Sequence, residues 1–377
     1  MERETELELI RRALEHLEAG APDRGHAEHE SPVWRYLDEA RFAEEQARIF
    51  ATVPQPVAHV AELAEPGDFL TLELGGAPLL LTRRSDGVVG AFLNVCRHRG
   101  TKLVGEPCGR RKRFVCPYHA WTYDQDGALV GVRQSDGFPT LPQADHGLVP
   151  VPCEERHGLV WVVTRHQPID VRSFLGEPLD RELAALDLGA LEPFRPERRV
   201  WRANWKLLVE GGLEAYHFAI AHAKTIARLF ADNVFLADRF ERHFRLTLVK
   251  KSLAELRGTD ESTWRLRDHA NVLYSLFPNG ALLVQPDHVA WIAFRPRAVD
   301  ATEVAITMLV PPGPRSEPEE KRWEKNHQLT LPTLAEDFEL AESIQSTLGS
   351  GANEALRFGR YEHLLGAFHD FVDAALE

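Results

Sequence analysis

The spacing of apolar residues predicts two helices at the start of the chain. Leu7, Ile10 and Leu14 recur every three or four residues in an otherwise charged segment, so they share one face of a helix. After a short loop, a second helical stretch is expected to continue to about Phe50. Because each stretch has one apolar side and one charged side, residues 1–50 are predicted to be amphipathic helices that pack on a catalytic domain.

From about residue 51 to 165 the pattern changes to short apolar or alternating runs. DFLTLEL, APLLLTR and HGLVWVVT are typical of strands, and Asp86-Gly87 and Asp126-Gly127 are typical of hairpin turns. Such closely spaced strands and turns predict a small antiparallel β-domain.

In residues 166–377 strands come first and long helices last. FRLTLVKKSL, NVLYSLF and TEVAITMLV predict strands, whereas the stretch between about Ser316 and Gly349 is helical, with a break expected near Pro332. A further helix closes the chain. The order predicts an α+β domain in which a long helix covers an antiparallel sheet.

Composition limits the kind of protein this can be. The 377 residues suffice for two domains, and the net charge of −13 argues against nucleic-acid binding. No apolar run is long enough for a membrane helix, and the charged N-terminus does not read as a signal peptide. Four cysteines, two of them in metal-type spacing, favour a reducing compartment, so a cytoplasmic location is predicted.

Two mixed pairs of possible metal ligands lie within the β-domain. They are Cys96-x-His98 and Cys116-x-x-His119, with seventeen residues between the pairs. A structural zinc site in a binding module is one interpretation. A cysteine followed by a histidine in each of two loops suits instead a two-iron cluster in which the cysteines ligate one iron and the histidines the other.

A second set of possible ligands begins with His217 and His222. On an ideal helix, residues five apart point about 140° away from each other and could not face one metal. The spacing therefore predicts a bulge or a helix end at this place, which Gly211 and Gly212 make easier because glycine weakens a helix.

The segments CRHRG and CPYHAWTYD resemble the Rieske domain of the ring-hydroxylating, non-haem iron oxygenases. Arg99 and Tyr118 stand where respiratory-chain Rieske proteins carry the cysteines of a disulfide, so the resemblance implies a disulfide-free cluster. Cys108 and Cys153 fall outside the motif. The resemblance implies a [2Fe–2S] cluster with four ligands: Cys96, His98, Cys116 and His119.

The segment from Asn204 to His222 resembles the motif of the family's catalytic domain. In that family two histidines and a later aspartate hold a mononuclear Fe(II), and the residues from Glu336 to Gln345 match the helix that carries the aspartate. The implied iron ligands are therefore His217, His222 and Asp337. The neighbouring Glu336, Glu339 and Glu342 are expected on the solvent face of that helix.

Glu214 matches a carboxylate that, in the family, links the two metal sites across a head-to-tail homotrimer. Most members have aspartate there, and the longer glutamate resembles the subset acting on carnitine- and betaine-like substrates. The implied fold is α+β, with a small antiparallel Rieske domain and a helix-grip catalytic domain. The aromatic residues of 218–230, 274–277 and 291–294 are expected to line the substrate pocket.

The resemblance implies the terminal oxygenase component of a Rieske oxygenase, with O2 as co-substrate. Electrons would come from NAD(P)H through a separate flavin or iron–sulfur reductase or a ferredoxin. The substrate would be an aromatic or other small organic molecule, which the enzyme would hydroxylate by mono- or dioxygenation or would oxidatively demethylate. Two alternatives stay open: a quaternary-ammonium monooxygenase of the same family, and a Rieske electron-transfer protein without catalysis.

Overall fold

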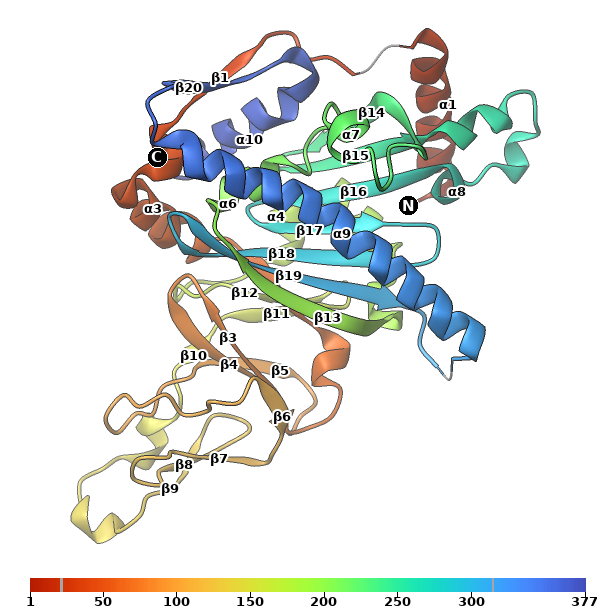
Figure 1. Ribbon diagram of the computed structural model, residues 1–377. Helices are drawn as coiled ribbons and strands as arrows, with labels where there is room; N and C mark the ends of the chain where they lie inside the picture. The colour runs from red at the N-terminus through yellow and green to blue at the C-terminus, as the bar shows by residue number, and fades with distance from the viewer. Residues whose placement is uncertain (21–22, 314) are drawn as a thin grey trace. The chain divides into compact units, whose positions relative to one another are not determined.

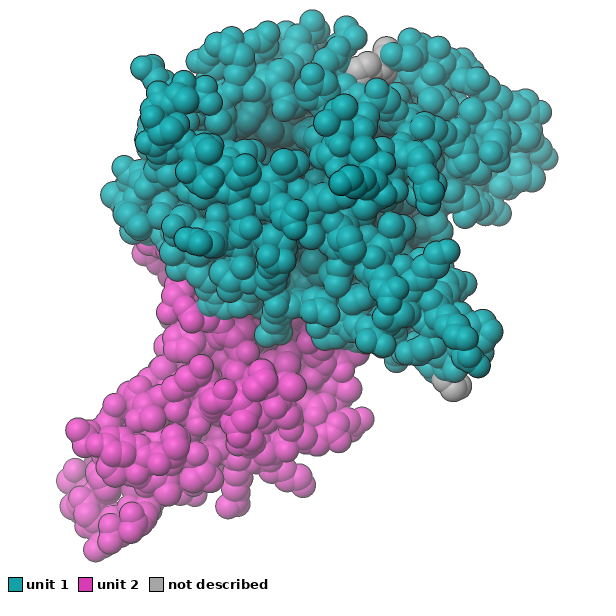
Figure 2. Space-filling model, viewed as in Figure 1, with its two compact units in different colours: residues 1–45, 175–377 teal, residues 46–174 magenta. Residues whose placement is uncertain are grey.

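A computed structural model describes residues 1–20, 23–313 and 315–377 (Figure 1). It contains two compact units, one formed by residues 46–174 and the other by residues 1–45 together with 175–377 (Figure 2). The chain thus begins and ends in the same unit.

Residues 46–174 form an antiparallel β-structure. Its largest sheet has the order β10 (Pro150–Val151), β5 (Val89–Leu93), β4 (Ala77–Arg83), β3 (Asp68–Leu74) and β6 (Cys108–Arg110). One small sheet joins β11 (Cys153–Arg156), β12 (Leu159–Val162) and β2 (Gln55–His59). The other joins β7 (Arg113–Val115), β8 (Thr122–Asp124) and β9 (Leu129–Gly131). Every strand pair in the unit is antiparallel, as predicted.

The second unit is built on a seven-stranded antiparallel sheet. Its order is β13 (Glu192–Trp201), β19 (Ala301–Val310), β18 (Val289–Ala298), β17 (Gly280–Val284), β16 (Ala270–Leu276), β15 (His243–Lys250) and β14 (Phe230–Phe240). The long helix α9 (Glu317–Leu348) crosses in front of this sheet in Figure 1. The unit therefore has the predicted architecture of a helix over an antiparallel sheet.

Shorter elements complete the second unit. Helix α1 (Arg3–Ala19) buries Leu9, Ile10 and Leu14 and lies beside β14, where Arg12 forms an ion pair of 2.9 Å with Asp238. Strands β1 (His29–Pro32) and β20 (Ala355–Phe358) pair with each other, next to α10 (His363–Ala374). The other helices of this unit are α2 (Trp34–Leu37), α3 (Glu39–Glu45), α5 (Glu177–Ala184), α6 (Trp205–Glu210), α7 (Phe218–Ala221) and α8 (Leu266–His269), whereas α4 (Val171–Leu175) spans the boundary between the two units.

One detail differs from the sequence predictions. The break expected near Pro332 is wrong, because α9 continues through the proline from Glu317 to Leu348. Proline removes one hydrogen bond from a helix, and a helix packed along its length tolerates that loss.

Candidate metal centres and substrate cavity

The two Cys/His pairs of residues 46–174 lie in loops with the same backbone hydrogen bonds. The Cys96 amide donates to the carbonyl of Thr101 at 2.9 Å, and the Cys116 amide donates to the carbonyl of Trp121 at 2.8 Å. Both cysteine side chains are buried in one hydrophobic cluster. The loops therefore present two thiols in equivalent backbone settings.

Each of these loops closes on a residue with positive φ. The amides of Gly100 (φ 75°) and Ala120 (φ 58°) donate to the carbonyls of Cys96 and Cys116, both at 3.0 Å. For alanine this left-handed conformation costs roughly 1–2 kcal/mol, and it persists only where the surrounding contacts fix the turn. The loops are thus held in shape by the polypeptide itself.

The imidazole rings of His98 and His119 lie next to each other. Their ring centroids are 4.6 Å apart at an interplanar angle of 73°, and Trp121 stacks on His98 at 4.8 Å. The Nδ1 atoms of both histidines are buried and have no hydrogen-bond partner among the described residues. A buried polar atom without a partner is costly, and a metal–ligand bond would remove that cost.

The thiols also favour a metal. Burial raises the pKa of Cys116 above its ordinary value, so the surrounding polypeptide alone does not stabilise the thiolate. A bound metal deprotonates a coordinating thiol through its own charge. Two buried sulfurs and two unpartnered imidazole nitrogens therefore fit the mixed ligand set of a Rieske [2Fe–2S] cluster.

The second set of ligands comes from the two ends of α7 and from α9. Asn204 caps α6, because its side chain accepts a hydrogen bond from the Lys206 amide at 3.1 Å. His217 directly precedes the single turn of α7, and His222 directly follows it. Their Nε2 atoms are 3.2 Å apart. The helix end predicted from the five-residue spacing is confirmed.

Asp337 of α9 completes a group of three possible ligands. Its Oδ1 atom lies 3.3 Å from His217 Nε2 and 3.1 Å from His222 Nε2. The three ligand atoms all lie within 4.8 Å of one another. Two ligands at right angles around one metal are about 3 Å apart, so the spacing fits the two-histidine, one-carboxylate face of a non-haem Fe(II) site.

The charges around this group favour a cation. Burial opposes a charge on His217, but hydrogen bonds with Asp337 and Glu214 outweigh it and raise the pKa of His217 to about 10. Burial alone would raise the pKa of Asp337, yet the two histidines hold it below its ordinary value. Positive charge between these carboxylates is therefore stabilised, and a bound metal ion would supply it.

Two further carboxylates bond the Nδ1 atoms of His217 and His222, the ring nitrogens that do not face Asp337. Glu214 Oε1 accepts a hydrogen bond from His217 Nδ1, and its Oε2 accepts the His217 amide at 3.2 Å. Glu336 Oε2 lies 2.8 Å from His222 Nδ1 and also accepts from the Thr225 hydroxyl at 2.7 Å. The prediction that Glu336 faces solvent is wrong, because its carboxylate on α9 lies against the His222 ring.

The remaining motif residues of α9 attach the helix to the chain before α6. Glu342 Oε1 accepts from the Arg202 amide at 2.7 Å, and Gln345 Oε1 accepts from the Asn204 amide at 2.9 Å. Glu342 is thus only partly exposed, whereas Glu339 is exposed as predicted. These two bonds fix the position of Asp337 relative to the histidines.

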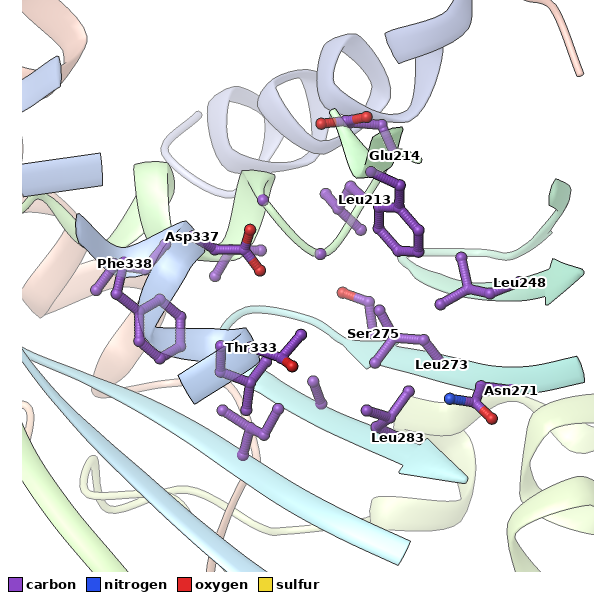
Figure 3. A pocket seen from close by; sticks show the side chains of 18 of the residues that line it. Leu213, Glu214, Leu248, Asn271, Leu273, Ser275, Leu283, Thr333, Asp337 and Phe338 are labelled. Carbon is purple, nitrogen blue, oxygen red and sulfur yellow. The ribbon is translucent and has the colours of Figure 1, made fainter. Parts of the chain in front are cut away.

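A cavity of about 100 Å³ lies beside Asp337 and His222 in the same unit (Figure 3). The aromatic residues Phe218, Phe230 and Phe294 line it, which confirms part of the pocket prediction. Tyr274 was also expected there, but its hydroxyl donates to Glu182 at 2.8 Å outside the cavity lining. Neighbouring residues on a strand face opposite sides, so Ser275 lines the cavity instead.

Two protein-family models match the chain. Residues 188–377 match the ring hydroxylating alpha subunit (catalytic domain), and residues 53–142 match the Rieske [2Fe-2S] domain. The first match alone spans half of the chain, so the protein belongs to the ring-hydroxylating alpha subunits of the Rieske oxygenases.

The curated relatives have several different substrates in their names. The glycine betaine monooxygenase oxygenase subunit of Chromohalobacter salexigens is 35% identical over 202 residues, 54% of this chain and 45% of that protein. The chlorobenzene dioxygenase subunit alpha of a Cupriavidus species is 33% identical over 209 residues, 54% of this chain and 46% of that protein. These alignments span about half the length of those relatives.

Solved structures show the same fold over nearly the whole chain. The quaternary ammonium Rieske monooxygenase CntA in complex with L-carnitine has a TM-score of 0.78 at 23% identity, covering 92% of this chain and 96% of that one. Naphthalene 1,2-dioxygenase with bound indole has a TM-score of 0.77 at 21% identity, covering 92% of both chains. The predicted α+β architecture is confirmed. Across the described residues, no helix is both long and apolar enough to cross a membrane.

Proposed function

We propose that this protein is the terminal oxygenase component of a Rieske non-haem iron oxygenase system. It uses O2 and electrons from an NAD(P)H-dependent reductase or a ferredoxin to oxygenate a small organic molecule. The observation that carries the proposal is the convergence of His217, His222 and Asp337 beside a cavity. A Rieske protein that only transfers electrons would need no such group.

The ligands are assigned in two sets. Cys96 and Cys116 would hold one iron of the cluster, and His98 and His119 would hold the other. His217, His222 and Asp337 would hold the mononuclear Fe(II). When bound, the cluster supplies single electrons and the mononuclear iron supplies the chemistry of O2 activation. This assignment rests on the buried, unpartnered Nδ1 atoms in the first set and on the Nε2 and carboxylate distances in the second.

The protein's own groups prepare both the ligands and the substrate. Glu214 and Glu336 each hold an Nδ1 proton, so that the Nε2 lone pairs of His217 and His222 point to the metal position. The apolar cavity walls exclude water and orient the substrate against the same position.

The proposal includes a head-to-tail homotrimer in the cytoplasm. Glu214 would connect His217 to a cluster histidine of the neighbouring subunit. The residue suits that role because it bonds the outer nitrogen of His217 and keeps some exposure, 10% for its side chain.

The proposed domains are an N-terminal segment (1–50), a Rieske domain (51–165) and a catalytic domain (166–377). The four free cysteines are consistent with a reducing compartment.

A second candidate is a monooxygenase of quaternary ammonium compounds. Three observations favour it: the glutamate at position 214, the glycine betaine and carnitine monooxygenases among the relatives, and the structural likeness to CntA. This candidate uses the same metal centres and differs only in the substrate.

Iron content and spectroscopy of ligand variants test the proposal. Anaerobically reconstituted protein should hold about three irons per chain and give the paramagnetic signal of a reduced Rieske cluster. His222→Ala should lose the mononuclear iron and keep the cluster signal, whereas His98→Ala should lose the cluster signal. With a surrogate reductase, only the unsubstituted protein should consume O2 and form an oxygenated product. Absence of the cluster signal in the unsubstituted protein would contradict the proposal.

A further inference from the structure

The cavity lies beside His217, His222 and Asp337, here called the triad, and has mostly apolar walls. Three of its polar lining residues, Glu214, His222 and Asp337, already bond to one another or to His217 in the metal centre. The other polar lining residues are Asn271, Ser275 and Thr333. A ligand that enters the cavity therefore meets hydrophobic surface and a few neutral hydrogen-bonding groups.

Asn271 and Ser275 mark two places along one strand. They are four residues apart on β16, so their side chains project from the same face of the sheet, with Cα atoms about 13 Å apart. Ser275 lies near the middle of the cavity in Figure 3, whereas Asn271 lies beside Leu248 and Leu283 at the end away from Asp337. A neutral amide thus stands at the end of the cavity remote from the triad.

The amide of Asn271 lacks a hydrogen-bond partner for its oxygen. Its Oδ1 atom is buried and has none among the described residues. This oxygen is out of reach of a ligand in the cavity, whereas the Nδ2 atom of the amide is drawn toward the cavity in Figure 3, so a ligand there meets an N–H donor. Rotation about the last side-chain bond exchanges oxygen and nitrogen, so the amide can pair with a hydroxyl, a carbonyl or another amide.

The same cavity is unsuited to a ligand that carries a carboxylate. No lysine or arginine is among the described residues that line it, and its acidic groups are Glu214 and Asp337. A carboxylate placed here would lose its hydration and meet no lysine or arginine, and the charge of the proposed Fe(II) is already offset by Asp337 and Glu214. The cavity is therefore poorly suited to betaine and carnitine, although monooxygenases named for these compounds are among the relatives.

We propose that the cavity takes an uncharged molecule with an apolar body and one neutral hydrogen-bonding group, which binds Asn271 while the opposite end lies at the triad. Asn271 is then a specificity-determining residue. The inference rests on the proposed function in one respect, namely that the end of the molecule at the triad is the end that reacts.

Binding measurements without a reductase test this inference separately from catalysis. Isothermal titration calorimetry of the iron-loaded protein under anaerobic conditions should give about tenfold tighter binding of para-ethylphenol than of para-ethyltoluene, since one buried hydrogen bond distinguishes the two. L-Carnitine and glycine betaine should bind more weakly than either. Equal affinity for the two aromatic probes, or tighter binding of a zwitterion, would overturn the inference.

Two variants test whether Asn271 causes the preference for the phenol. Asn271→Leu should abolish the tenfold difference by weakening the phenol alone. Thr247→Val is the matched control, because the Thr247 hydroxyl is also buried without a partner among the described residues, on the neighbouring strand β15, but outside the cavity lining. It should keep the difference. If Asn271→Leu does not fold, Asn271→Thr, which retains a hydroxyl, should keep part of the preference, and an unchanged tenfold ratio in either variant at position 271 would overturn the assignment.

The outcome separates the inference from the proposed function. A protein that prefers the phenol but forms no product with any substrate would support the inference about the cavity and contradict the oxygenase assignment. A protein that oxygenates a substrate but shows no preference at Asn271 would do the reverse.

Discussion

His222 lies between two adjacent carboxylates of α9. Glu336 bonds its Nδ1 atom at 2.8 Å, and the next residue, Asp337, faces its Nε2 atom at 3.1 Å. One helix turn therefore supplies both a proposed metal ligand and the group that orients a second ligand. The pair fixes the ring in the tautomer whose Nε2 lone pair points to the metal position.

Replacing Glu336 by alanine is expected to weaken Fe(II) binding about 10- to 100-fold. The His222 ring would lose the acceptor that fixes its orientation, while all three proposed ligands remain. Competition with a chelator measures the affinity. Glu339→Ala, three residues further on the exposed side of the same helix, serves as the control and should leave the affinity unchanged. Equal effects of the two substitutions would contradict the orienting role.

Glu214→Ala is expected to abolish coupled product formation while both metals stay bound at saturating iron. Glu214 contacts His217 through Nδ1 and is not a metal ligand, so its loss affects the connection between the sites more than their occupancy. Iron content and the cluster signal measure the first property, and product yield per O2 consumed measures the second. Glu214→Asp, which keeps the carboxylate, should retain part of the yield. Unchanged product formation in the alanine variant would rule out the linking role.

The sequence pattern predicted interior strands and missed most of the two edge strands of the seven-stranded sheet. DFLTLEL and APLLLTR coincide with β3 and β4 because their apolar residues are continuous or alternate. The seven-stranded sheet ends in β13 and β14. Strand β13 is mostly exposed and contains two prolines, and β14 has a register shift between Phe230 and Phe235. An edge strand pairs on one side only, so its sequence is less constrained.

The metal-site residues differ in how far their sequence identifies them. His217 and His222 are recognisable because their spacing and context are local. Glu336 was misplaced because its contact with His222 spans 114 residues and depends on where the fold places α9. Asn271 carried no sequence signal at all, since an asparagine in a strand gains meaning only when its neighbours leave it unpaired.

A buried ion pair is expected to contribute strongly to the stability of the second unit. Lys206 Nζ lies 2.6 Å from Glu45 Oε1 with side-chain exposures of 1% and 0%, and Trp205 donates to the other oxygen of Glu45 at 2.8 Å. Lys206→Met would leave the Glu45 carboxylate buried without its nearest cation. The substitution should lower the free energy of unfolding by about 3–5 kcal/mol, as measured by urea denaturation.

The control for this experiment is a pair on the surface. Lys321 and Glu317 are 2.5 Å apart, but their side chains are 74% and 79% exposed. Lys321→Met should change the free energy of unfolding by less than about 1 kcal/mol. The double substitution Lys206→Met with Glu45→Gln should recover part of the loss, because it removes a buried carboxylate whose remaining cation is Arg41 at 3.3 Å. A loss in Lys206→Met no larger than in the surface variant would show that the buried pair is not needed.

Thiol labelling of the folded, cluster-loaded protein is expected to modify Cys108 alone at a fast rate. Cys108 is exposed, whereas burial raises the pKa of Cys153 and so lowers its reactive thiolate fraction at mildly alkaline pH. Cys96 and Cys116 are buried and, in the proposed cluster, bonded to iron. Cys108→Ser should therefore leave no fast-reacting thiol until the protein is unfolded in denaturant, when the other three become reactive. Mass spectrometry after brief labelling identifies the sites, and fast labelling of Cys96 or Cys116 in the loaded protein would contradict their assignment as cluster ligands.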